Sequence, residues 1–324
     1  MSAPAERPAV IVEATGQLSA QAAAQVRALV AAAASADQVP PLSEHVTLHL
    51  RYGGDVRART FLARLDGRIV GYGHLDITDE VEGASAEVVV DPGSRRGGAG
   101  RALVEAMLDA SPYRQLRLWA HGDHPAAAAL AASLGFERVR SLWQMRRSLA
   151  EPWPDAVLPP GITVRTFVSD QDEASWVALN RRAFADHPEQ GRWTIEDLRQ
   201  RMCEQWFDPA GFFLAERDGR LVGFHWTKIH GGRHGAELHG HEPLGEIYVI
   251  GVDPGEQGSG LGTALSVIGL AHLRDKGLAE AMLYVEASNT GAIRVYEKLG
   301  FSHSDTDVMF RHMGEREGPG ATTP

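Results

Sequence analysis

The 324-residue sequence contains a single cysteine, Cys203, and no long run of basic residues. One cysteine cannot form an intramolecular disulfide and is typical of proteins in a reducing compartment, so we expect a cytoplasmic location. The net charge is −10, and no cluster of Lys and Arg is available to displace counterions from a nucleic acid or an anionic membrane. The charge therefore favours a neutral or cationic small molecule as the partner.

Long apolar runs are missing as well. No stretch approaches the ~20 apolar residues that span a bilayer, and the N-terminal residues lack the basic start and continuous apolar core of a signal peptide. We therefore expect a soluble protein with no membrane partner, and we expect it to act as a monomer. Residues 315–324, which include Gly318-Pro319-Gly320, are expected to form a disordered tail.

What the sequence does contain is an internal repeat. An Asp-Pro pair and a glycine-rich loop occur twice, 162 residues apart (253 − 91 = 162), and a Leu-Gly-Phe segment follows each loop. The repeat predicts two similar domains, over residues 1–150 and 162–314, with residues 151–161 as a proline-rich linker. The repeated segments are Asp91-Pro92, Arg95-Arg96-Gly97-Gly98-Ala99-Gly100 and Leu134-Gly135-Phe136, then Asp253-Pro254, Gln257-Gly258-Ser259-Gly260-Leu261-Gly262 and Leu299-Gly300-Phe301.

Both halves alternate strand-like and helix-like segments in the order β-α-α-β-β-β-α-β-α-β, which predicts an α/β protein. Asp66-Gly67 and Asp218-Gly219 predict tight hairpin turns, because this dipeptide readily adopts positive φ angles. Each glycine-rich loop lies between an expected strand and an expected helix. Backbone N–H groups and the positive end of a helix dipole meet there, so the loop is suited to bind a pyrophosphate.

Glycines at positions 258, 260 and 262 would let the backbone approach that anion without a Cβ in the way. The order Gln-x-x-Gly-x-Gly disfavours a dinucleotide-binding fold, which uses Gly-x-Gly-x-x-Gly. Together with the preceding Asp-Pro and the following Asn289-x-x-Ala292-x-x-x-Tyr296, the loop resembles the GNAT family of acyl-CoA N-acyltransferases. The resemblance covers nearly the whole chain as a tandem pair.

This resemblance implies two tandem GNAT domains of the α/β (α+β) class, each a mixed, mostly antiparallel twisted sheet flanked by helices. It also implies acetyl-CoA as the co-substrate. The acetyl-CoA contacts expected in the second domain are Ile250, Gly251, Val252, Gln257, Gly258, Ser259, Gly260, Leu261, Gly262, Thr263, Asn289, Thr290, Gly291, Ala292, Ile293 and Arg294. Those expected in the first domain are Val88, Val89, Val90, Arg96, Gly97, Gly98, Ala99, Gly100 and Arg101.

A closer resemblance, dense in the second half and thinner in the first, is to the mycothiol synthase family of tandem acetyltransferases. The phrases that carry it include Phe184-Ala185-x-His187-Pro188-Glu189-Gln190-Gly191, Gly223-Phe224-His225-Trp226-Thr227-Lys228 and Gly245-Glu246-Ile247-Tyr248-Val249-Ile250-Gly251. It implies acetyl transfer to the cysteinyl amine of 1D-myo-inositol 2-(L-cysteinylamino)-2-deoxy-α-D-glucopyranoside. The acceptor pocket would be lined by Glu44, Glu189, Lys228, Glu246 and Tyr284, at the interface of the two domains.

Comparison of the two halves predicts that the second is catalytic. Aligned on the repeats, Glu246 falls on Ala84, and Tyr296 falls on Ala131. Amide formation requires a neutral amine and a proton for the departing thiolate. An α-amine has a pKa near ~8 and a thiol near ~8.5, so Glu246 would accept the amine proton, directly or through water, and Tyr296 would protonate the thiolate. The transfer would be direct, in a ternary complex, and the first domain would bind acetyl-CoA without turnover.

Several alternatives remain open at this stage. Glu246 could be a solvated or substrate-pairing carboxylate with no role in proton transfer, Tyr296 could be a core residue, and Asn289, aligned with His124, could be a helix N-cap. The chain could instead acetylate an aminoglycoside or a protein N-terminus, or act as a non-catalytic acyl-CoA sensor. Four histidines of a glycine-rich insert match no zinc spacing, so no metal is expected. They are His230, His234, His239 and His241, and the insert is expected to form a mobile loop beside the acceptor pocket.

Overall fold

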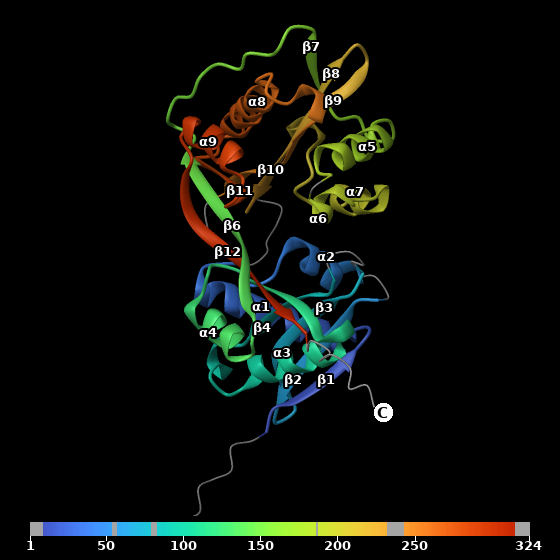
Figure 1. The fold of residues 1–324 in the computed structure, drawn as a ribbon, viewed down its shortest axis with the longest axis vertical. Helices are drawn as coiled ribbons and strands as arrows, with labels where there is room; N and C mark the ends of the chain where they lie inside the picture. Colours follow the sequence, from blue (N-terminus) through green and yellow to red (C-terminus); the bar gives the residue numbers. More distant parts are fainter. Residues whose placement is uncertain (1–8, 54–56, 79–82, 186, 232–242, 315–324) are drawn as a thin grey trace, which may run out of the picture. The chain divides into compact units, whose positions relative to one another are not determined.

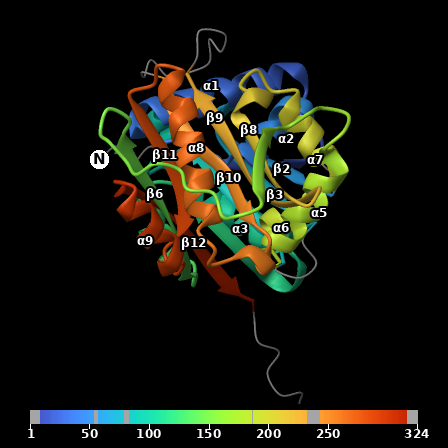
Figure 2. The same ribbon diagram turned by 90° about the horizontal axis from the view of Figure 1, so that it is seen from above.

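The computed structural model describes residues 9–53, 57–78, 83–185, 187–231 and 243–314. The chain forms two compact units (Figure 1), and Figure 2 shows the same ribbon from above. Unit one comprises residues 1–141 and 306–324, and unit two comprises residues 142–305. Among the described helices, none is both long and apolar enough to cross a membrane. The predicted disordered tail lies outside the described residues.

The described strands of unit one follow the order β1-β2-β3-β4-β5-β12, and among these pairs β4–β5 is parallel and the others are antiparallel. Its strands are β1 (Ile11–Thr15), β2 (Arg59–Leu65), β3 (Arg68–Asp76), β4 (Ser85–Val90), β5 (Gln115–Ala120) and the end of β12 (Ser302–Met313). Its helices are α1 (Ala20–Asp37), α2 (Glu44–Tyr52), α3 (Ala99–Ala110) and α4 (Pro125–Ser133), with 3-10 turns η1 (Pro92–Ser94) and η2 (Pro112–Arg114).

Two cores cover the two faces of this sheet. Because strand side chains alternate between faces, Leu75 of β3 packs in the core that contains Leu103 of α3, whereas Tyr72 packs in the core that contains Val26 of α1 and Val46 of α2. Helices α3 and α4 therefore cover one face, and α1 and α2 cover the other. The side chain of Ser43 accepts a hydrogen bond from the backbone N–H of Val46 and caps α2.

Unit two has the same plan, with strand order β6-β11-β10-β9-β8-β7 and β10–β11 as its parallel pair. Its strands are β6 (Glu137–Ser148), β7 (Ile162–Thr166), β8 (Phe212–Arg217), β9 (Arg220–His230), β10 (Leu244–Val252) and β11 (Glu280–Glu286). Its helices are α5 (Glu173–Ala183), α6 (Pro188–Gly191), α7 (Ile195–Met202), α8 (Leu261–Asp275) and α9 (Thr290–Lys298), with 3-10 turns η3 (Pro209–Gly211) and η4 (Pro254–Glu256).

The two faces of the unit-two sheet also carry separate cores. Helices α8 and α9 pack with β10 and β11 on one face, and α5 and α7 pack with β8 and β9 on the other (Figure 1). The second core is aromatic, with Trp176 and Trp226 fully buried and stacked or edge-on against Phe212 and Phe224. Both predicted hairpin turns form, with positive φ at Asp66-Gly67 and Asp218-Gly219.

The last strand of each repeat enters the sheet made by the other repeat. Residues 142–148 of β6 pair with β11 in unit two, and residues 308–313 of β12 pair with β5 in unit one. Residues 142–150 and 306–314 thus belong to the opposite units from those expected of domains 1–150 and 162–314. Residues 151–161 connect β6 to β7 inside unit two rather than joining two domains.

A buried charged triad anchors β12 in unit one. Nδ1 of His121 lies 2.8 Å from Oδ2 of Asp307, and Nε2 of His121 lies 3.5 Å from Oε2 of Glu87. The backbone N–H of Gly122 donates to Oδ1 of Asp307 at 3.0 Å. Burial alone would lower the pKa of His121, but the hydrogen bond to Asp307 and the nearby carboxylate of Glu87 outweigh it and raise this pKa to about 10. His121 is therefore a buried cation between two carboxylates.

We expect Asp307→Ala to lower the free energy of unfolding by about 3 kcal/mol, because it removes one partner from a buried ion pair. The matched control is Asp123→Ala, which breaks an exposed pair with Arg138 and should cost less than about 1 kcal/mol. Denaturant unfolding, with hydrogen exchange in β5 and β12, measures both. Equal costs for both variants would contradict the triad's role.

The contribution of protonated His121 to the free energy of unfolding should be complete below pH ~6.5 and lost as pH rises through about 10.

Candidate functional site

The candidate site of unit two starts where two parallel strands separate. Strands β10 and β11 pair only from Gly245 with Ala281 to Ile247 with Leu283, although β10 continues to Val252 and β11 to Glu286. Beyond Ile247, the edge of β10 that faces β11 has no strand partner among the residues that the structure describes. Its main-chain N–H and C=O groups are available to a ligand lying between the strands.

A β-bulge at Tyr248 accompanies the separation. Thr227 and Trp226 are consecutive in β9, yet they pair with Ile247 and Val249 of β10. The extra residue puts Tyr248 and Val249 on the same face, where both pack in the aromatic core beside α5 and α7. The bulge thus bends β10 at the point where it parts from β11.

Gly251 brings β10 close to the aromatic core. A Cβ at this position would lie 2.6 Å from Cε1 of Phe224 and 3.1 Å from Cβ of Ala183. The phenyl ring of Phe224 is fully buried and cannot move away. Only glycine fits here, so β10 can run between the ring of Phe224 and the space that separates it from β11.

The loop after β10 forms an anion site from main-chain groups. Gly258 and Gly260 adopt φ angles of +77° and +91°, and Gly260 caps α8 with no side-chain hydrogen bond. The first intrahelical bond is from the N–H of Ala264 to the carbonyl of Gly260, so the preceding N–H groups, including those of Gly262 and Thr263, are not used by the helix. These donors and the helix dipole favour a phosphate. Gln257, Ser259 and Thr263 are exposed at this loop, and Leu261 is buried.

Unit one keeps this loop in altered form. Gly98 caps α3 with a φ of +92°, matching Gly260, but Arg96 takes the left-handed position that Gly258 occupies in unit two, with a φ of +63°. The two terminal nitrogens of Arg95, Nη1 and Nη2, donate hydrogen bonds to the carboxylate of Asp37 at 2.7 and 2.6 Å, so they are not available to an anion at the loop. Arg95 therefore neutralises Asp37, while Arg96 and Arg101 remain exposed near the helix start.

The separation of strands is repeated in unit one without the bulge. Strands β4 and β5 pair from Ser85 to Glu87 of β4, and β4 continues to Val90. Val89 faces α1 and α2, whereas Val88 and Val90 pack toward α3 and α4. The pairing of β3 with β4 is regular throughout. The main-chain edge is thus kept, but its geometry differs from that of β10.

The carboxylate of Glu246 lies near the start of β10. Glu246 is only 6% exposed, and its Oε2 atom lies 2.7 Å from Nε2 of His230 on β9. A Cβ on neighbouring Gly245 would touch Leu273 of α8, so Glu246 points to the opposite face, toward α5 and α7. His230 was considered only as a metal ligand in the sequence, because no local spacing shows that it adjoins Glu246. Its counterparts His234, His239 and His241 lie outside the described residues.

Lys228 lies directly across from Glu246 in the β9–β10 pair. Its Nζ atom is 4.6 Å from the ring centroid of Trp206 and 5.0 Å from that of Tyr248. Arg201 donates from Nε to the Tyr248 hydroxyl at 2.9 Å. Cationic and aromatic groups thus surround the carboxylate on one face, an arrangement suited to a polar ligand with both hydroxyl and ammonium groups.

The other predicted acceptor residues are spread over the chain. Tyr284 is 38% exposed on β11, on the same face as Met282, which is paired with Glu246, and its hydroxyl accepts a bond from Gln144 at 3.1 Å. Glu189 is in α6, but its side chain lies outside what the structure describes. Glu44 starts α2 in unit one. The prediction that Glu44 joins the others in one pocket stays a prediction.

Helix α9 holds the remaining predicted residues. Oδ1 of Asn289 accepts a bond from the N–H of Ala292 at 3.1 Å, so Asn289 is an N-cap, and in unit one Nδ1 of His124 caps α4 by accepting from the N–H of Ala126. Thr290, Gly291 and Arg294 are exposed in the first turns, whereas Ile293 is buried in the core.

Tyr296 lies in the core between α9 and β11, edge-on to Phe301. Burial raises the pKa of its phenol to about 12. Within the described residues its hydroxyl has no hydrogen-bond partner. The ring is thus a core residue, as one alternative held, and its hydroxyl remains available as a donor.

The strand register revises one part of the repeat alignment. When β4 and β10 are aligned at Val90 and Val252 and their residues are counted backward, the bulge adds one residue to β10. Glu246 therefore corresponds to Ser85 rather than to Ala84. Ser85 pairs with Asp76 of β3 as Glu246 pairs with Lys228 of β9. Unit one still has no carboxylate at this position.

Two segments of the chain match known acetyltransferase patterns. Residues 57–138 match the Acetyltransferase (GNAT) domain, and residues 143–301 match the Acetyltransferase (GNAT) family. Among solved structures, a GCN5-related N-acetyltransferase from Sphaerobacter thermophilus aligns with a TM-score of 0.65 and 26% identity, over 93% of this chain and 95% of that one. A tandem GNAT protein from the clavulanic acid biosynthesis pathway aligns with a TM-score of 0.69 and 21% identity, over 94% and 98%. The second likeness concerns the fold alone.

Two relatives are similar over nearly their whole length. A protein named mycothiol acetyltransferase from Acidothermus cellulolyticus is 55% identical over 319 residues, covering 96% of this chain and 97% of that protein. One of the same name from Streptosporangium roseum is 53% identical over 337 residues, covering 93% and 98%.

We expect Gly251→Ala to lower the free energy of unfolding by about 1–3 kcal/mol, because its Cβ must displace the buried ring of Phe224. Gly262→Ala is the matched control. Its Cβ would meet only Val252, at 3.7 Å, and alanine in α8 should stabilise the helix by up to about 1 kcal/mol. Denaturant unfolding compares the two variants. A Gly251→Ala chain as stable as the original would show that β10 is not held against the aromatic core.

Proposed function

Because the chain belongs to the mycothiol acetyltransferase family, we propose that it transfers the acetyl group of acetyl-CoA to the cysteinyl amine of 1D-myo-inositol 2-(L-cysteinylamino)-2-deoxy-α-D-glucopyranoside, forming mycothiol. Membership of this family and two tandem GNAT domains make the chain an N-acetyltransferase, as its motifs predicted. The observation that carries the finer proposal is the buried carboxylate of Glu246 at the start of the strand whose free edge leads to the glycine-capped helix α8.

Acetyl-CoA would bind along this edge. Its pyrophosphate would accept bonds from the N–H groups at the start of α8, where the helix dipole also favours negative charge. The pantetheine arm carries amide groups, and these can pair with main-chain groups of Ile250 and Val252 as an added strand would. The thioester would then lie between β10 and β11, and a main-chain N–H would hold its carbonyl oxygen.

The acceptor amine would be activated by Glu246. A carboxylate can accept the proton of an ammonium group of pKa near ~8 directly or through one water, which leaves the lone pair free to attack the thioester carbonyl. His230 holds Oε2 of Glu246 at 2.7 Å, so it would act as a positioning residue and leave Oε1 for the amine. Acetyl-CoA and acceptor would be bound together, and the new amide C–N bond would form as the C–S bond breaks, with no acyl-enzyme.

The departing thiolate would take its proton from Tyr296. With a pKa of about 12, the phenol is fully protonated at neutral pH and can donate. Transfer to a thiolate of ordinary pKa near ~8.5 would be uphill. The burial that raises the phenol pKa also disfavours a free thiolate in the same environment, so the two pKa values lie closer together at the site than in water.

The acceptor would be recognised on the face that carries Glu246. Lys228 can donate to sugar or inositol hydroxyls, and the carboxylates of Glu44 and Glu189 can accept from hydroxyl and ammonium groups. Tyr284 adds a hydroxyl at the exposed part of β11. The negative net charge of the chain favours the ammonium form of the acceptor during encounter. Unit one, with its loop but without Glu246 and Tyr296, would bind acetyl-CoA without turning it over.

Glu246→Gln and Tyr296→Phe should each lower kcat by about 10²–10⁴-fold with little change in acetyl-CoA affinity, because each removes one proton transfer. Steady-state kinetics with the cysteinyl pseudo-disaccharide measure kcat, and calorimetry measures acetyl-CoA binding. Matched controls are Glu280→Gln at the start of β11 and Tyr113→Phe in η2, which change exposed groups in the same way. Unchanged turnover in both site variants would remove the assigned roles.

Gly260→Val should abolish tight acetyl-CoA binding in unit two, because a β-branched residue cannot easily hold a φ of +91° and the helix start would rearrange. Gly277→Val is the control, since Gly277 has a φ of +82° and open space around it at the other end of α8. Calorimetric stoichiometry separates the units. Two equivalents should fall to one in Gly260→Val and also in Gly98→Val. Retention of all binding in Gly260→Val would overturn the loop assignment.

A further inference from the structure

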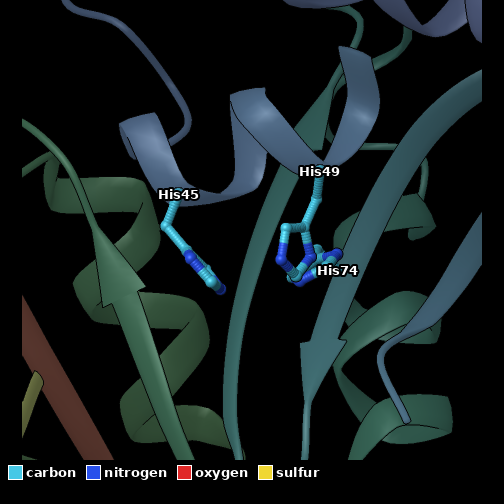
Figure 3. Close-up of side chains that lie close together, drawn as sticks. All are labelled: His45, His49 and His74. Carbon is cyan, nitrogen blue, oxygen red and sulfur yellow. The ribbon is translucent and has the colours of Figure 1, made fainter. Parts of the chain in front are cut away.

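Three histidines of unit one point toward one another outside the proposed catalytic site. His45 and His49 extend from α2, and His74 extends from β3, with one ring nitrogen of each within 4.8 Å of the others (Figure 3). The ring centroids of His45 and His49 are 4.2 Å apart, and those of His49 and His74 are 5.0 Å apart. Imidazole nitrogens gathered in this way are a common ligand set for divalent transition metals.

The local structure explains why they meet. Residues four apart on a helix lie on one face, so His45 and His49 both face the sheet. The Ser43 cap fixes where α2 begins, and Val46 and Leu48 of α2 are buried. His74 rises from β3 on the face that α2 covers, while the adjoining Gly73 faces Met107 of α3 on the other side.

Asp76 supplies a fourth donor. It is two residues after His74 on the same face of β3, and its Oδ2 lies 3.2 Å from Nε2 of His45. Two ligands at about 2.0 Å from a tetrahedral zinc ion are about 3.3 Å apart, so this spacing fits two corners of one coordination shell. The other oxygen, Oδ1, accepts a bond from the N–H of Thr78 at 2.7 Å, which leaves Oδ2 toward His45.

His74 is the buried member of the set. It is 4% exposed, and its Nε2 atom is buried with no hydrogen-bond partner among the described residues. A buried ring nitrogen without a partner is costly unless a ligand satisfies it.

We propose that His45, His49, His74 and Asp76 form a binding site for one Zn²⁺ ion or a similar divalent transition metal. Three nitrogens and one oxygen complete a tetrahedral shell, which is typical of a structural site. The ion would fix α2 to β3. The sequence suggested no metal, because two ligands lie on a helix and two on a strand about 25 residues further along (74 − 49 = 25).

The strand register shows which residues of unit two correspond to the proposed metal ligands of unit one. His74 of unit one corresponds to Trp226 of unit two, and Asp76 corresponds to Lys228, since they pair with equivalent positions of β4 and β10. The face that carries acceptor-side groups in unit two thus carries metal ligands in unit one. If the proposed function holds, the ion would also hold the helix that begins with Glu44.

The test uses the full chain without an affinity tag, stripped with a chelator and then titrated with Zn²⁺ by calorimetry. Co²⁺ serves as a second probe, because its visible spectrum reports tetrahedral coordination. We expect one tight equivalent per chain, at least 10-fold weaker binding in His45→Ala and in Asp76→Asn, and loss of that equivalent in the His45→Ala/His49→Ala double variant. The control is His124→Asn, which alters an exposed histidine but keeps an N-cap residue, and should bind as the original does.

Hydrogen exchange provides an independent measurement. Zn²⁺ should slow exchange of α2 amides in the original chain and not in the double variant, whose retained fold is checked by the exchange of α3. The proposal is overturned if the original chain has no tight equivalent, or if the double variant keeps it, which would place the metal at other histidines such as those of residues 230–241. None of these measurements depends on acetyl transfer, so their outcome is independent of whether the proposed function is correct.

Discussion

The separation of β10 from β11 after Ile247 is the constraint on which the site of unit two depends. Two parallel strands that stay paired would consume each other's main-chain groups and leave nothing for a ligand. Here the bulge at Tyr248 bends β10, the absence of a Cβ at Gly251 lets it run against Phe224, and Gly260 starts α8 at its end. Main-chain donors are thus left for a ligand at the strand edge and at the helix start, on either side of the loop that joins β10 to α8.

The two repeats show which parts of this arrangement can change separately. Unit one keeps the diverging strands and a glycine-capped helix, yet it has no bulge in β4 and no carboxylate at Ser85. Its buried acid, Glu87, is instead paired with His121, so it is committed to an internal ion network. Anion binding by main-chain groups needs little more than backbone geometry, whereas proton transfer needs particular side chains. The second property therefore depends on more particular residues than the first.

The exchange of β6 and β12 makes each unit depend on both repeats. The last strand of a sheet of this kind covers an edge that would otherwise present unpaired N–H and C=O groups. Because β5 is paired with β12 and β11 with β6, neither repeat closes its own sheet. Asp307 near the end of the chain consequently completes a charged network whose other members are 186 and 220 residues earlier (307 − 121 = 186; 307 − 87 = 220).

The sequence by itself determined the repeat, the α/β class, the two hairpin turns and the glycine-capped helix starts. These follow from local rules, because positive φ angles and helix caps depend on one or two residues at a time. Tertiary structure alone decided that β6 and β12 change sheets, that His230 adjoins Glu246, and that Glu246 corresponds to Ser85. It also brought His45 and His49 to His74 and Asp76. Strand pairing and a single-residue bulge join distant residues, and no pattern within one segment of the chain records them.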